Sequence, residues 1–156
     1  MTSFTERRAE QGSDVTSVTR DVKVTAQTSV FPLTTKPDRR DVRRWIRSTH
    51  SSRLDVHTLV DVLLVTTELI DNAYRHTTSP IELRIACTAL GVLVEVADGD
   101  KDHPAEMAAS DRAWGGRGVQ AVVELAISWG VREEGSGKAV WALLPMVETR
   151  FTPRSG

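Results

Sequence analysis

The 156-residue chain has little of several features that mark particular protein classes. Its single cysteine, Cys87, excludes an internal disulfide framework and a cysteine-rich zinc site, and it suits a reducing compartment. No apolar run approaches the roughly 20 residues of a membrane-spanning helix, and the polar N-terminus has no signal-peptide core. With 20 basic and 21 acidic side chains, the formal net charge of -1 gives no general attraction to nucleic acid. We therefore expect a cytoplasmic protein that binds neither membranes nor nucleic acid directly.

Several catalytic signatures are missing as well. The four histidines fit no zinc spacing such as His-Glu-x-x-His, and there is no Gly-x-Ser-x-Gly nucleophile turn. The run DGDKD at 98–102 resembles a calcium loop, but that loop needs Gly at its sixth position and Glu at its twelfth. This chain has His103 and Ala109 there. A zinc enzyme, a serine hydrolase of that type and a calcium-loop protein are therefore set aside.

What the chain does contain is the pattern of one α+β domain over residues 21–148. Hydrophobic content of 40% is ordinary for such a domain. Polar residues 1–20 are predicted to be a disordered tail, and 149–156 a second tail. Apolar spacing predicts helices over about 38–49, 54–76 and 118–126, and strands over 22–33, 81–87, 92–97, 127–132 and 138–144. We predict a two-layer sandwich with a mostly antiparallel sheet and helices on one face.

The long second helix carries polar residues where its apolar pattern is strongest, in the run TTELIDNAYRH at 66–76. Glu68 and Asn72 are four residues apart, so their side chains lie on one face, one turn apart. Taken alone, the pair is either part of a solvated face or the wall of a site.

Two other segments could complete a site. Asp98-Gly99 ends an apolar strand, where a carboxylate can accept a hydrogen bond from an exocyclic amine such as that of adenine and a glycine lets a ligand approach the backbone. A solvated turn is the alternative. Gly116-Arg117-Gly118-Val119 opens a helix whose backbone N–H groups would favour an anion. It is neither the dinucleotide fingerprint nor a P-loop, and a flexible hinge explains it nearly as well.

The order of these segments resembles the GHKL ATP-binding family, which has the Bergerat fold. It is most similar to the small anti-sigma-factor serine kinases of the RsbW and SpoIIAB type. The run ELIDN at 68–72 is similar to that family's N box, Asp98-Gly99-Asp100 to its first glycine box, and Gly116 to Val119 to its second. Trp129-Gly130-Val131 and the run GKAVW at 137–141 are similar to the closing hairpin of actinobacterial members. The resemblance covers residues 30–145.

The resemblance implies a role for each residue. Asn72 would bind Mg²⁺, and Glu68 would be the general base that takes the proton of a serine on a partner protein. Asp98 would hold the adenine amine beside Gly99. The backbone of Gly116, Gly118 and Val119 would bind the ATP phosphates. Arg117 would add charge there or point into solvent.

The resemblance also implies partners and a rival function. An ATP-dependent serine/threonine kinase of this type phosphorylates an anti-anti-sigma (STAS-type) protein, sequesters a sigma factor and forms a homodimer. Asp100 and Asp102 stand where the wider fold has glycines, and Ala139 where relatives often have a threonine that supports the adenine-binding aspartate. These departures leave open a second hypothesis, a catalytically weak or inactive nucleotide-binding module that acts by protein binding only.

Overall fold

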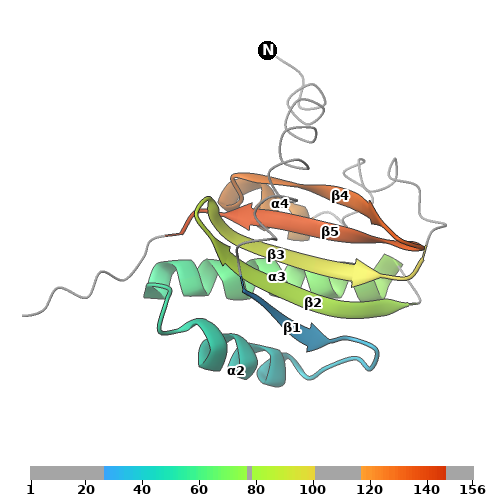
Figure 1. Ribbon diagram of the computed structural model, residues 1–156, viewed down its shortest axis with the longest axis horizontal. Coiled ribbons are helices and arrows are strands. Elements are labelled where there is room, and N and C mark those ends of the chain that lie inside the picture. Colours follow the sequence, from blue (N-terminus) through green and yellow to red (C-terminus); the bar gives the residue numbers. More distant parts are fainter. Residues whose placement is uncertain (1–26, 77–78, 101–116, 147–156) are drawn as a thin grey trace, which may run out of the picture.

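The computed structural model describes residues 27–76, 79–100 and 117–146, and Figure 1 shows their arrangement. Both predicted tails lie outside these ranges, as does Gly116. The elements in chain order are β1 (Thr28–Pro32), α2 (Arg39–His50), α3 (Val56–His76), β2 (Pro80–Thr88), β3 (Gly91–Asp98), α4 (Arg117–Leu125), β4 (Ser128–Glu134) and β5 (Gly137–Leu144).

The five strands form one sheet in the order β1-β2-β3-β5-β4, and every neighbouring pair is antiparallel. Because side chains alternate along a strand, β3 directs Val92, Val94 and Val96 to one face and Leu93 and Glu95 to the other. The three valines join the main core with the buried residues of the helices. Figure 1 shows α3 along this face. The predicted α+β class, with an antiparallel sheet and helices on one face, is confirmed.

The first helix, α2, forms because its start is capped and its apolar residues share one stripe. The Asp38 side chain accepts a hydrogen bond from the Arg40 N–H at 2.8 Å, as expected for an N-cap. Val42 and Ile46 are buried, while the arginines between them face solvent. The predicted helix after Asp38 is therefore confirmed.

The long helix α3 is the element that positions the candidate site. Asp55 caps its start, since its carboxylate accepts the Thr58 N–H at 2.8 Å. The side chains of Val62, Val65, Leu69 and Ala73 are buried in the core at helical spacing, and α3 packs against β2, β3, β5, α2 and α4. No helix in the described ranges is long and apolar enough to cross a membrane.

Candidate functional site

Two buried side-chain oxygens of α3 have no hydrogen-bond partner among the described residues: Thr66 Oγ1, which is fully buried, and Asn72 Oδ1, which lies beside Glu68 on the polar face. Glu68 and Asn72 are both half-buried, one turn apart. The amide oxygen of Asn72 is buried, yet it accepts no hydrogen bond from any residue that the structure describes. Buried polar atoms are nearly always satisfied. An oxygen left without a donor is what a cation site or a ligand donor would complete.

The Asp98 side chain lies at the end of β3 and is 3% exposed. Its Oδ1 accepts the Asp100 N–H at 2.9 Å and the Lys138 ammonium at 3.2 Å, and its Oδ2 lies 3.1 Å from the same ammonium. Oδ2 thus keeps one lone pair that no described donor uses. The Asp100 contact is a local side-chain turn, but the Asp98 side chain is buried, so the turn is not a solvated one. The Gly99 N–H donates to the Ser79 carbonyl at 2.9 Å.

Lys138 is a site residue that sequence reasoning missed. The register pairs Asp98 with Lys138 and Ala97 with Ala139, so Lys138 shares the face of Asp98 and Ala139 points to the opposite face. In this chain, therefore, position 139 does not face the Asp98 side chain. The only available signal was that Lys138 follows Gly137 at the strand start, and a register cannot be read from that.

Gly137 is needed for this approach between the strands. A Cβ at Gly137 would lie 1.9 Å from the Asp98 carbonyl oxygen, far inside van der Waals contact. Only glycine lets β5 begin directly against the end of β3, which places the Lys138 ammonium beside the carboxylate.

The predicted phosphate-binding segment is only partly described. Helix α4 begins at Arg117, so Gly118 and Val119 lie in its first turn. Gly116 lies outside the described residues, and the side chain of Arg117 is not described.

Helix α3 connects these pieces. It packs against β3, β5 and α4, the three elements that carry Asp98, Lys138 and Gly118. The second half of α3 and the end of β3 lie at the same end of the molecule (Figure 1). Residues 101–116, between β3 and α4, lie outside the described ranges, so the cavity that these groups would share is not described.

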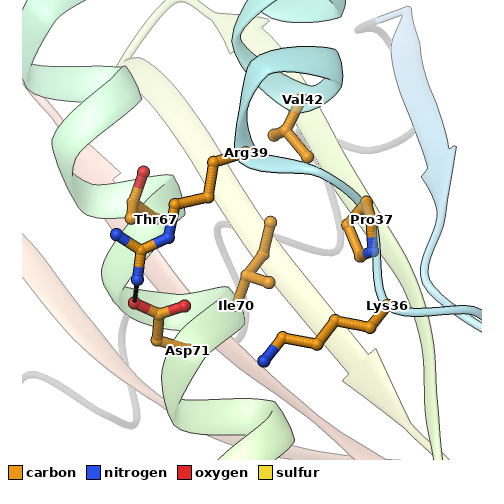
Figure 2. Close-up of a pocket in the computed structure, with 7 residues that line it drawn as sticks. All are labelled: Lys36, Pro37, Arg39, Val42, Thr67, Ile70 and Asp71. Atoms are coloured by element: carbon orange, nitrogen blue, oxygen red, sulfur yellow. Dashed lines mark hydrogen bonds and ion pairs between the residues drawn. The ribbon is translucent and has the colours of Figure 1, made fainter.

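A small pocket lies on the other side of α3, between that helix and the start of α2 (Figure 2). Arg39 reaches from α2 to Asp71, with an Nη2–Oδ2 distance of 2.8 Å. The cavity volume of about 60 Å³ is far below the roughly 300 Å³ of a small-molecule site. The polar residues of the ELIDN run therefore lie on different sides of α3. Asp71 faces α2 and lines this pocket, whereas Glu68 and Asn72 do not line it. Its lining residues are Lys36, Pro37, Arg39, Val42, Thr67, Ile70 and Asp71.

The contact between Cys87 and His50 offers no rival site. His50 Nδ1 lies 3.9 Å from Cys87 Sγ. Burial, and secondarily the charge of Arg53, lowers the pKa of His50, whereas burial raises the pKa of Cys87. Both shifts favour neutral side chains, the opposite of an activated thiolate. The described residues contain no group of three His, Cys, Asp or Glu side chains that could hold a metal ion.

No protein-family model matches this chain, and a search of curated proteins gives no significant match.

Proposed function

We propose that this chain has the GHKL fold and is an ATP-binding protein-serine kinase of the anti-sigma-factor type. The observation that supports this most is the unsatisfied Asn72 oxygen one turn from Glu68, on a helix that packs against the elements bearing Asp98 and Gly118. A solvated helix face would leave that oxygen in water rather than buried without a donor.

The residues present fit a magnesium ion. Mg²⁺ keeps several waters and takes few protein ligands, so the Asn72 oxygen together with phosphate oxygens is a sufficient set. When bound, the ion would neutralise charge on the phosphates during transfer. The absence of a three-carboxylate or histidine cluster in the described residues is compatible with such a sparse site.

The protein side chains then have distinct tasks. The free lone pair of Asp98 Oδ2 accepts a hydrogen bond from the adenine amine, and Gly99 lets the adenine lie close to the backbone. The backbone N–H groups of Gly116, Gly118 and Val119, at the N-terminus of α4, hold the phosphates. Arg117 adds positive charge at that end.

Glu68 acts at the reacting end. Its carboxylate accepts the proton of a serine hydroxyl on the partner while the hydroxyl oxygen forms a bond to the γ-phosphorus and the bond to the ADP oxygen breaks. A positioned general base contributes about 10²–10⁴-fold to such a reaction. Positioning and electrostatic stabilisation of the phosphoryl group supply the remainder.

The substrate in this proposal is a cytoplasmic anti-anti-sigma protein of the STAS type, and the kinase sequesters a sigma factor as a homodimer. The second candidate is a nucleotide-binding module that acts by protein binding alone. One observation favours it. The Lys138 ammonium already contacts both oxygens of the Asp98 carboxylate, and this contact competes with binding of the adenine amine.

The kinase is tested by incubating the chain with labelled ATP, Mg²⁺ and candidate STAS-type partners. In Glu68→Gln we expect transfer to fall by about 10²–10⁴-fold with ATP affinity retained, because only the proton acceptor is lost. The matched control is Asp71→Asn, three residues along the same helix. Asp71 faces Arg39 instead, so this variant should keep its transfer rate.

The outcomes separate the two candidates. ATP binding without transfer to any partner supports the binding module. A chain that binds no ATP at millimolar concentration has neither function.

A further inference from the structure

The sheet face opposite the helices, here called the outer sheet face, carries a second apolar cluster. Leu93 lies between Ala86 and Leu143 through its cross-strand pairs, and Trp141 is adjacent on β5. These four side chains are only 2–8% exposed. They are as well buried as the main core on the helix side.

The described helices do not account for this burial. Helices α2, α3 and α4 pack on the face that carries the main core. Figure 1 shows α3 on that side. The Trp141 ring lies against its cross-strand neighbour Gly130, where a Cβ would be 3.1 Å from the ring. The sheet thus covers one side of the indole, yet Trp141 as a whole is 3% exposed. Something must also cover its other side.

Charged residues on the same face are withdrawn from water too. Glu95, directly opposite Trp141 in the register, is 1% exposed. Arg132 donates to its Oε1 at 2.8 Å, and Arg84 lies 3.6 Å from its Oε2. A charged side chain that is removed from water needs such ion pairs, whereas a charged side chain on a solvated face does not. The outer sheet face is therefore dry around Trp141 and Glu95, whereas Val30 on its β1 edge is 48% exposed.

We propose that residues 1–26 of this same chain are the cover of the outer sheet face. They join the described structure immediately before Gln27 and Thr28. Thr28 pairs with Ala86, a member of the cluster, so the segment starts at the edge of the surface that it covers.

The segment is long enough for this role, and although residues 1–20 are mostly polar, it carries several apolar side chains. From β1 to β5 there are three strand spacings, roughly 15 Å, while 26 residues can span roughly 80 Å. Phe4, Val15, Val18 and Val22 supply apolar side chains. Covalent attachment makes the contact intramolecular, with a millimolar effective concentration that a separate partner would have to exceed. The C-terminal residues 147–156 are shorter and offer only Val147 and Phe151 as large apolar side chains.

This inference does not depend on the proposed kinase activity, and it is tested in the full-length chain. A nitroxide spin label is attached at Ser17→Cys, or separately at Ser13→Cys, in a Cys87→Ser background with ¹⁵N labelling. The measured quantity is the indole N–H signal of Trp141, assigned with Trp141→Phe. We expect the label to abolish this signal from at least one of the two positions. The indole signal of Trp45, which lies on α2 behind the opposite face, is the internal control and should persist.

Three results would overturn the proposal. The first is a Trp141 signal that persists with both labels. The second uses a mixture of spin-labelled chains without ¹⁵N and ¹⁵N-labelled chains without a spin label. If the Trp141 signal is lost in this mixture, the spin label acts between molecules and the cover is a second copy of the chain. The third is loss of the signal from a label at Ser155→Cys and from neither N-terminal position, which would assign the cover to the C-terminal segment.

Discussion

At the scale of single residues, the ion pair of Asp98 and Lys138 fixes the geometry and charge of the part of the site proposed to bind adenine. The carboxylate is nearly inaccessible and its counter-charge is one ammonium, which also contacts the Asp100 carbonyl at 3.3 Å. Burying a carboxylate is costly unless it is paired, so Lys138 stabilises both the fold and the geometry of Asp98.

Replacing Lys138 with methionine keeps the length of the side chain and removes the charge. We expect Lys138→Met to lower the free energy of unfolding by about 2–3 kcal/mol, because Asp98 would be left without its cation. The exposed Lys36, which lies 5.7 Å from the ring centroid of Tyr74, is the matched control, and Lys36→Met should cost less than about 1 kcal/mol. Urea titrations measure both values.

A double-mutant cycle sharpens this test. Asp98→Asn combined with Lys138→Met removes both charges, so the double variant should be more stable than the sum of the single effects predicts. If Lys138→Met and Lys36→Met lowered the free energy of unfolding by equal amounts, the structural role given to the Asp98–Lys138 ion pair would be contradicted.

At the scale of elements, the close junction between the end of β3 and the start of β5 shapes the site. Gly137 at the start of β5 and Gly135 in the β4–β5 turn have different reasons to be glycine. Gly137 is there because of the Asp98 backbone that it touches, whereas Gly135 has a positive φ of 57° and nothing within 4 Å of an added Cβ. The first is a packing requirement and the second a conformational one.

Alanine at the two positions separates these requirements. Gly137→Ala should destabilise the domain by about 3 kcal/mol or more, because a Cβ cannot occupy the space of the Asp98 carbonyl. Gly135→Ala should cost only about 1 kcal/mol, the strain of a left-handed alanine. Thermal and urea unfolding of both variants measure which one loses more stability. If Gly137→Ala lost no more stability than Gly135→Ala, β5 would be able to shift away from β3.

At the scale of the whole molecule, helix α3 is the structural centre, since it contacts the sheet, α2 and α4 together. A ligand that binds between α3, the end of β3 and α4 would therefore connect elements that are distant in sequence. Any ligand that binds only the native state raises its stability by mass action.

We expect Mg-ATP at 100 times its Kd to add about 2.7 kcal/mol, a rise of about 5–10 °C in Tm for a domain of this size. Asp98→Asn should remove most of this shift, and so should Asn72→Ala or an excess of EDTA. Asp71→Asn, whose side chain faces the pocket beside α2, should retain it. Differential scanning fluorimetry measures each shift relative to the same variant without nucleotide, and an unchanged shift in Asp98→Asn would place the nucleotide elsewhere.

Much of the fold followed from the sequence because the relevant signals are local. The Asp38 and Asp55 caps and the apolar stripe of α3 depend on neighbours within a few residues, and the two helices that they define were predicted. The same spacing put Glu68 and Asn72 on one face. By itself, then, the sequence determined which segments are helices and strands, and which polar residues stand out from them.

Only the tertiary structure decided which of these residues meet. The register of β3 with β5 brought Lys138 to Asp98 and turned Ala139 away, and a shift by one residue would have reversed both. The placement of α2 directed Asp71 to Arg39, and the sheet acquired a second buried cluster around Trp141 and Glu95 on its outer face. These outcomes arise from contacts between segments far apart in the chain. Periodicity along one segment carries no information about them, because their energy depends on which partner the folded chain places opposite each side chain.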